Sequence, residues 1–256
     1  MARATALRRG TEMLLAALFA APLLVLVVQA FADEWRAPAI IPTEFGTRGF
    51  EAAFAQGNAA QALINSTSIA LLTTGLALII GWPAARALGH KRARQPAVVV
   101  LVALPLLIPP FATGTGLAEW FIRLGIADTI FGVALAHLTA VLPYVILILA
   151  LGFTDALLEL EDVARTFGAG FARRLAFVTI PTVATSLATA SLLAFLVSWA
   201  QYGTSLAVGG GLPTLPVALL PYVRTDAQVA AALSLLMIVP AVLTLLIALR
   251  SGRRTL

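Results

Sequence analysis

The chain has 256 residues, of which 60% are hydrophobic and only 11% are charged, whereas soluble domains carry roughly 25% charged residues. It contains no cysteine, which excludes disulfides, thiolate metal sites and cysteine nucleophiles, and its two histidines, His90 and His137, are too few for a histidine-based metal cluster. This composition predicts an integral membrane protein.

Apolar runs of about 20 residues, the length that crosses a bilayer core, recur along the chain. We expect six helical spans, at residues 13–32, 62–85, 97–117, 129–152, 182–207 and 229–249. The segments between them contain the glycine and proline typical of loops, and no second soluble domain fits between them. The sequence therefore predicts an all-α membrane protein in which residues 1–256 form a single transmembrane domain.

The first apolar run has an alternative interpretation. Arg8 and Arg9 precede it and Ala30-Phe31-Ala32 ends it, which together resemble a signal peptide that is cleaved from the mature protein. Cleavage there would leave five spans.

Basic residues gather on one side of the predicted membrane. That side holds thirteen of the seventeen: Arg3, Arg8, Arg9, Arg86, Lys91, Arg92, Arg94, Arg165, Arg173, Arg174, Arg250, Arg253 and Arg254. The other side holds only Arg36, Arg48, Arg123 and Arg224. Because short cytoplasmic loops retain Lys and Arg, both termini are predicted to be cytoplasmic. The net charge of +5 is thus a topology signal, and we expect no nucleic-acid partner.

The segment between the fourth and fifth predicted spans, residues 155–181, is the most distinctive part of the sequence. Its apolar residues recur at helical spacing, as Leu157, Leu160, Ala164 and Phe167. With acidic residues near its start and Gly168 after it, this pattern predicts an amphipathic helix that ends at the glycine, followed by a second short amphipathic segment. Taken alone, the segment also suits a helix lying at the lipid headgroups.

The spacing within this segment resembles the cytoplasmic coupling loop of binding-protein-dependent ABC importer permeases. The family motif runs Glu-Ala-Ala, three residues, Gly, nine residues, Ile-x-Leu-Pro. This chain has Asp162-Val163-Ala164, Gly168 and Val178-Thr179-Ile180-Pro181 at the same spacing. Further resemblance lies in Asn65-Ser66-Thr67, Leu104-Pro105, Pro109-Pro110 and Leu142-Pro143-Tyr144. Together these imply the six-helix type I importer permease fold in a bacterial cytoplasmic (inner) membrane.

The resemblance also implies which residues meet the ATPase. The expected coupling residues are Glu159, Glu161, Asp162, Val163, Ala164, Phe167, Gly168, Ile180 and Pro181. Because Asp162 stands where the family has Glu, either it or the neighbouring Glu161 could make the family's polar contact.

The chain is not expected to be an enzyme itself. A phosphate-binding loop would need the pattern Gly, four residues, Gly-Lys-Ser/Thr, but the only lysine, Lys91, lies between His90 and Arg92. No cofactor is expected in this chain, and ATP and Mg would be bound by a partner ATPase dimer. The resemblance further implies a second permease subunit, homologous or identical, and an extracytoplasmic substrate-binding protein.

Polar side chains within the predicted spans are candidates for the substrate pathway, because the bilayer penalises them elsewhere. They are Asn65, Tyr144, Ser198, Trp199, Gln201 and Tyr202, with Ser66, Thr67 and His137 near them. Each one taken singly is equally suited to a hydrogen bond between helices or to an interfacial position. We expect His137 to bind a neighbouring helix rather than a metal.

Residues 198–203 and 209–216 resemble the family branch that serves polyamines, thiamine, and iron or oxyanion ligands. Within that branch we expect a small organic cation such as a polyamine or thiamine, for which Trp199, Tyr202 and Tyr222 would offer cation–π faces. The alternative functions are a self-sufficient secondary transporter or channel, and a membrane-embedded enzyme. The first would carry an internal repeat or intramembrane ionisable residues, and the second a nucleophile–base pair, and the sequence presents neither pattern.

Overall fold

The computed structural model describes residues 2–35, 38–56, 58–89 and 95–252, with side chains for Arg9 and for the described positions from 11 to 243. These residues are almost entirely helical. They fall into two compact units, Met1–Gln61 with Ala218–Leu256, and Ala62–Val217. Several basic residues used for the orientation lie outside the described residues, namely Arg36, Lys91, Arg92, Arg94, Arg253 and Arg254.

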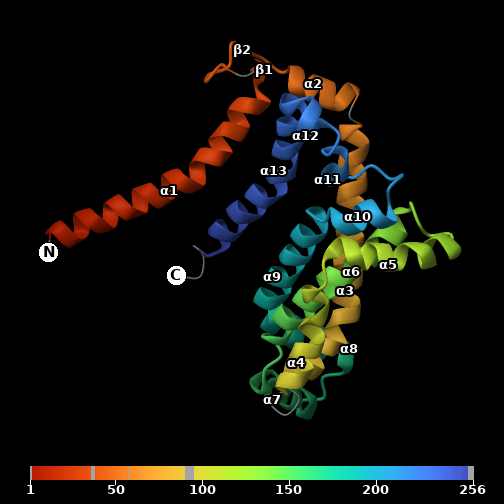
Figure 1. Ribbon diagram of the computed structural model, residues 1–256. Coiled ribbons are helices and arrows are strands. Elements are labelled where there is room, and N and C mark those ends of the chain that lie inside the picture. Colours follow the sequence, from red (N-terminus) through yellow and green to blue (C-terminus); the bar gives the residue numbers. More distant parts are fainter. Residues whose placement is uncertain (1, 36–37, 57, 90–94, 253–256) are drawn as a thin grey trace. The chain divides into compact units, whose positions relative to one another are not determined.

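The first unit consists of four helices and a small hairpin (Figure 1). Its elements are α1 (Ala2–Ala30), β1 (Ala32–Glu34), β2 (Glu44–Phe45), α2 (Arg48–Ala55), α12 (Tyr222–Thr225) and α13 (Ala227–Gly252). The two strands are antiparallel, with Ala32 opposite Phe45, and both α1 and α2 pack against α13. The hairpin was not predicted, since strands of two and three residues are too short to show an alternating pattern.

The second unit contains the remaining helices. They are α3 (Ala59–Gly89), α4 (Pro96–Ala103), η1 (Leu104–Leu107), α5 (Pro110–Arg123), α6 (Ile130–Ala150), α7 (Asp155–Thr166), α8 (Phe171–Arg174), η2 (Leu175–Thr179), α9 (Ile180–Trp199), α10 (Gly203–Val208) and α11 (Leu215–Ala218). Helices α3 and α11 cross the boundary between the units by a few residues.

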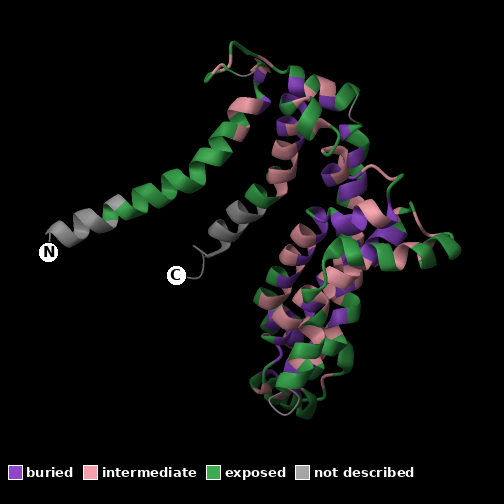
Figure 2. Cartoon of the chain, in the orientation of Figure 1, coloured by how far each residue is buried: buried purple, intermediate pink, exposed green. Residues whose placement is uncertain are grey.

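Small residues set the packing of this unit. Ala77 on α3 and Ala194 on α9 are fully buried with Val141 and Val145 of α6, and a Cβ atom at Gly81 would lie 2.9 Å from Val145 Cγ1. Within lipid, helices associate through close backbone approach rather than through exclusion of water, so small residues are favoured there. By contrast, most described side chains of α1 are exposed (Figure 2).

Among the residues that the structure describes, four helices are long and apolar enough to cross a bilayer. They comprise Thr11–Ala30, Ala59–Gly89, Ile130–Ala150 and Phe171–Trp199. The sequence predicted a span at each of these places, and the structure confirms an apolar helix of sufficient length there.

The third expected span, residues 97–117, is not one straight helix. Pro96–Leu107 and Pro110–Arg123 meet at an angle of 84°, and Ile108 and Pro109 between them have extended backbone. Proline lacks the N–H that a helix needs and disfavours helical conformation in the residue before it, so the Pro109-Pro110 pair breaks the helix. If the bent pair counts as one span, the described residues contain five candidate spans.

The fifth and sixth spans also differ from expectation. The fifth helix starts at Phe171 and ends at Trp199, so Ile180 and Pro181 lie within it and α10 is a separate helix. The expected sixth span coincides with α13, whose described apolar part, Ala227–Leu243, falls in the class of shorter apolar helices.

Candidate functional site

Helix α7 is amphipathic as expected, but most of its apolar face is exposed. Only Leu157 and Glu161 are buried, whereas Leu160 and Val163 are about half exposed and Phe167 is 86% exposed. Leu157 packs into a core cluster with Phe153 and with residues of α3, α6 and α9. The helix is therefore attached along one narrow line and presents its other apolar side chains outward.

Glu161 is the buried acid of this segment, with 6% of its surface exposed. Arg86 at the end of α3 donates to both carboxylate oxygens, through Nη1 to Oε1 at 2.9 Å and through Nη2 to Oε2. The hydroxyl of Thr179 in η2 donates to Oε1 at 2.6 Å. Hydrogen bonding from Arg86 lowers the pKa of Glu161 below its ordinary value, with a smaller lowering by Thr179. The carboxylate thus joins three helical segments.

Asp162 does not take part in this contact. Its side chain is 69% exposed and lies 3.5 Å from Arg165 on the same helix. Glu159 is exposed as well. The residue that aligns with the family's motif is therefore not the one that makes the buried polar contact, which Glu161 makes. Its partners Arg86 and Thr179 were not predicted.

Gly168 ends α7 with a left-handed backbone, at φ +80°. The Gly168 N–H donates to Arg165 O at 2.9 Å and the Ala169 N–H to Ala164 O at 3.0 Å, which is the Schellman pattern of a glycine-terminated helix. The turn leaves Phe167, Phe171 and Phe177 each more than 70% exposed.

The following helix contains a π-helical turn, η2. The Ile180 N–H donates to Leu175 O, five residues earlier, immediately before Pro181. Proline has no N–H to offer, so the backbone accommodates Pro181 by shifting its register here. Both Ile180 and Pro181 are exposed.

A second group of polar side chains lies where α9 ends and α10 begins. His137 of α6 is buried, and its two ring nitrogens contact Ser198 Oγ at 2.8 Å and Ser205 Oγ at 2.9 Å. Ser198 precedes the break and Ser205 follows it. His137 therefore contacts both α9 and α10, in agreement with its expected contact to a neighbouring helix.

Close packing explains the glycine after the break. A Cβ atom at Gly203 would lie 2.7 Å from the Phe111 nitrogen, and one at Gly114 would lie 2.7 Å from the Ala207 Cβ. Helices α5 and α10 thus approach each other at distances that only glycine allows.

Three predicted pathway residues, Ser198, Trp199 and Gln201, line one narrow cavity that has no room for a water molecule. The others that line it are Ser66, Ile69, His137, Ser205, Thr214 and Pro216. Asn65 lies nearby, buried, and donates from Nδ2 to Pro213 O at 2.8 Å. Tyr144 and Tyr202 do not line this cavity, and sequence reasoning missed Ser205 and Thr214.

Two aromatic residues of the second unit were expected to offer cation–π faces. Trp199 lines this cavity and Tyr202 does not. Trp199 is 5% exposed and stacks on Phe195 at 5.8 Å between ring centroids, so one of its faces is covered.

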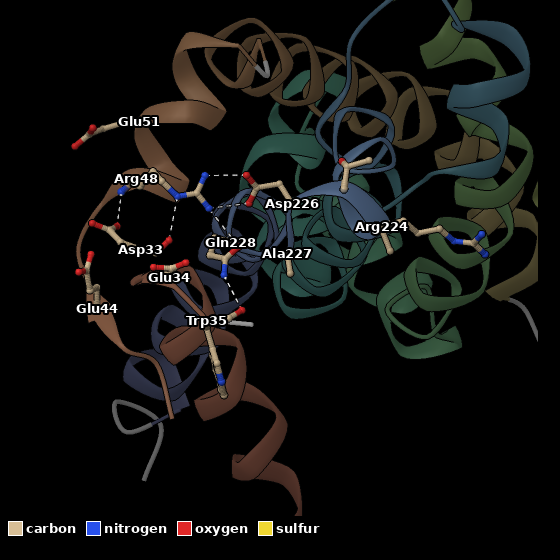
Figure 3. Close-up of a pocket in the computed structure, with 12 residues that line it drawn as sticks. Asp33, Glu34, Trp35, Glu44, Arg48, Glu51, Arg224, Asp226, Ala227 and Gln228 are labelled. Atoms are coloured by element: carbon tan, nitrogen blue, oxygen red, sulfur yellow. Dashed lines mark hydrogen bonds and ion pairs between the residues drawn. The ribbon is translucent and has the colours of Figure 1, made fainter. Parts of the chain in front are cut away.

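In the first unit, Arg48 joins the hairpin, α2 and the start of α13 (Figure 3). Its guanidinium donates to both oxygens of Asp226, at 2.8 and 3.0 Å, and to Gln228 Oε1 at 3.2 Å. Its Nε donates to the Asp33 carbonyl at 3.2 Å, and its backbone N–H donates to the Asp33 carboxylate at 2.9 Å. Hydrogen bonding to Asp226 raises the pKa of Arg48, and hydrogen bonding from Arg48 lowers the pKa of Asp226.

This network borders an open cavity of about 750 Å³. Its other lining residues include Glu34, Glu44, Glu51 and Arg224, so acids outnumber bases around it. The sequence did not predict the Arg48–Asp226 pair, whose members are 178 residues apart.

Known proteins similar to this chain are permeases. The chain is 33% identical over 202 residues to ModB, a molybdenum transport system permease protein of Mycobacterium bovis, with 72% of this chain and 76% of ModB covered. It is 31% identical over 185 residues to SugB, a trehalose transport system permease protein of Mycobacterium tuberculosis, with 70% and 67% covered. PhnV of Salmonella typhimurium, named for a 2-aminoethylphosphonate transport system, is 28% identical over 239 residues, with 92% and 88% covered. No family model matches the chain.

This chain belongs to the permease subunits of binding-protein-dependent ABC transporters. It is accordingly a multi-pass membrane protein, the transmembrane permease subunit of an importer, and it has no ATPase site of its own. These relatives are named for molybdenum, a sugar and a phosphonate, and none for a polyamine or thiamine. The expectation of a small organic cation is therefore not supported by them.

Proposed function

We propose that this chain forms half of the substrate pathway of a bacterial ABC importer and that residues 155–181 couple the pathway to a separate ATPase dimer. One observation carries the proposal: Glu161 holds α7 to α3 and to the Phe171–Trp199 helix, while Phe167 at the end of α7 is 86% exposed. Residues 155–181 therefore expose an apolar side chain that a partner can bind. The same residues are held by hydrogen bonds to the helices that the partner would move.

The proposed complex contains two permease subunits, two ATPase subunits and an extracytoplasmic binding protein. Membership of the permease family supports these partners. The residues proposed to meet the ATPase are Phe167, Gly168, Leu160 and Val163, all on the exposed side of the turn. We propose that the turn at Gly168 is held in position by residues inside the permease, namely Glu161, Ile180 and Pro181.

Co-purification tests this assignment. A tagged chain expressed with its genomic neighbours should bring down an ATPase in near-equal amount, and proteoliposomes of the complex should take up solute only with ATP and the binding protein. Uptake by the chain alone in liposomes would instead favour the self-sufficient transporter or channel.

We also propose six spans with both termini in the cytoplasm. In this arrangement α4, η1 and α5 together form the third span, and α13 forms the sixth. The excess of basic residues on one side supports the orientation, because it places Arg86 and Arg173 inside and the hairpin with α2 outside.

Cysteine labelling tests the orientation, since the chain has no cysteine of its own. Ala55 in α2 and Arg173 in α8 are exposed, so a cysteine at either position is accessible to a reagent on its own side of the membrane. On intact cells an impermeant maleimide should label Ala55→Cys and leave Arg173→Cys unlabelled until the membrane is permeabilised. Labelling of Arg173→Cys from outside would reverse the orientation and remove α7 from reach of a cytoplasmic ATPase.

Within the second unit, we propose that the side chains around the α9–α10 break face the transported solute. Ser198, Trp199 and Gln201 meet there with Ser66 and Thr214. Such a gathering of polar groups is costly within a membrane and is characteristic of a transport pathway.

A further inference from the structure

The described residues that line the cavity at the α9–α10 break include no charged side chain. Its polar members are serine, threonine, glutamine, histidine and tryptophan, and its remaining members are Ile69 and Pro216. A cation in such a place would need carboxylates or several acceptor oxygens to replace its hydration. The lining therefore suits a solute that is recognised by neutral hydrogen-bonding groups.

The hydrogens at His137 can be assigned from the contacts. The Ser205 hydroxyl donates its one hydrogen to the backbone carbonyl oxygen of Gln201 at 2.6 Å. Towards His137, Ser205 can therefore only accept, and His137 Nε2 is the donor. A neutral imidazole carries one hydrogen, so Nδ1 accepts from Ser198. His137, Ser198 and Ser205 thus satisfy one another and fix the backbone of Gln201.

Two polar groups that line the cavity have no hydrogen-bond partner among the described residues. They are the side-chain nitrogen Nε2 of Gln201 and the hydroxyl Oγ1 of Thr214, and both are buried. Gln201 is 9% exposed and Thr214 is 2% exposed. An amide nitrogen can only donate, and a hydroxyl can donate too, so both groups can bind acceptor atoms.

In this conformation the cavity is too narrow to admit a water molecule. Unpaired buried donors destabilise such a narrow arrangement, so they favour its opening. When the cavity widens, Gln201 and Thr214 are the groups that gain partners.

We propose that Gln201 and Thr214 bind the transported solute through its acceptor atoms, and that the solute is therefore small and acceptor-rich, either an oxyanion or a polyhydroxylated sugar. The inference rests on the proposed function, in which this cavity belongs to the pathway. It assigns Gln201 and Thr214 as specificity-determining residues. Because the lining is neutral, an oxyanion would be held by hydrogen bonds alone and could leave without breaking an ion pair.

The experiment uses the complete complex, with its ATPase and binding protein, in proteoliposomes. The probes are molybdate, phosphate, trehalose and spermidine, and the measurement is the initial rate of ATP-dependent uptake. We expect uptake of at least one of the first three probes. Gln201→Met and Thr214→Val remove a donor with little change of volume, and each should lower that rate roughly tenfold, as expected for one lost hydrogen bond.

Gln201→Glu separates the two kinds of solute. It replaces the donor by a carboxylate of the same shape, so it should abolish oxyanion uptake by repulsion and reduce sugar uptake only as far as Gln201→Met does. The matched control is Thr189→Val in α9, whose hydroxyl is exposed and donates within its own helix at 2.8 Å. Its uptake should equal that of the wild type.

Uptake of spermidine and of none of the acceptor-rich probes would overturn the inference, as would wild-type rates for both Gln201→Met and Thr214→Val in well-expressed complex. Failure of the proposed function looks different, because no ATPase would then co-purify with the wild-type chain.

Discussion

Phe167→Ala should separate the permease from its ATPase without disturbing the permease itself. Because the Phe167 side chain is 86% exposed, its removal leaves no cavity within the chain. If Phe167 is an interface hot spot, its loss costs about 2–4 kcal/mol of binding, or a roughly 30- to 1000-fold weaker association. The measurement is ATPase retained on the tagged permease in detergent, together with transport and transport-stimulated ATP hydrolysis, all of which should fall. Ligand capture by the isolated binding protein should be unchanged.

Gly168→Val should have a similar effect for a different reason. At φ +80° a β-branched side chain strains the backbone, so the turn that presents Phe167 should shift. Gly170→Val is the matched control, because Gly170 has φ −65° and, like Gly168, open space where a Cβ atom would lie.

Gln201→Ala should alter transport while leaving ATPase association intact. Wild-type association and transport in both Phe167→Ala and Gly168→Val would make this segment an ordinary interfacial helix.

Glu161→Ala should loosen α7 from the helices that it joins. The change removes the carboxylate that accepts from the Arg86 guanidinium and leaves the Thr179 hydroxyl only the long contact to the Arg174 carbonyl, at 3.4 Å. Breaking a buried ion pair costs about 3–5 kcal/mol, and we expect the lower end because the Arg86 side chain is 36% exposed. The thermal unfolding midpoint in detergent should fall, and proteolysis between α7 and α8 should become faster. Asp162→Ala, at the exposed neighbour, should change stability by no more than about 0.5 kcal/mol.

The same contact predicts a dependence on pH. Since the pKa of Glu161 is lowered in the folded protein, its contribution to stability is present above the ordinary carboxyl value of 4.5 and is lost as the pH falls through the lowered pKa. The difference in melting midpoint between the wild type and Glu161→Gln should therefore be largest near neutral pH and should shrink below pH 4.5. A difference that stays constant into acid would show that the carboxylate is not held in its charged form.

The sequence predicted the helices well where one apolar run makes one helix, as at Ile130–Ala150. It failed at the bend before Pro110 and at the break after Trp199. The proline pair was visible in the sequence, but one span was expected across it. The second break has no proline and depends on tertiary contacts of His137 and on the close approach of α5 to Gly203. Hydropathy does not record such contacts.

For the candidate site, the sequence located the segment but not its contacts. The family motif left the polar contact open between Asp162 and Glu161, and burial and hydrogen bonding single out Glu161. Its partner Arg86 lies 75 residues away, and its position in the sequence indicated only the orientation in the membrane. The Arg48–Asp226 pair was missed for the same reason. Pairings between distant residues follow from the fold, and no local pattern encodes them.

The unbroken helix from Phe171 to Trp199 has a mechanical consequence. At 1.5 Å per residue it is a rod about 44 Å long, and Thr179, tied to Glu161, lies about 12 Å from its start and about 30 Å from its end. If this helix rotates about Thr179 as a rigid body, the end at Trp199 moves roughly 2.5 times as far as the end at Phe171, because it lies that much farther from Thr179. The π-helical turn Leu175–Thr179 lies between Phe171 and this pivot, so bending of the turn would reduce the movement that is passed on to Trp199. A displacement of about 1–2 Å at Phe171 would then correspond to roughly 2.5–5 Å at Trp199, next to the cavity that Gln201 lines.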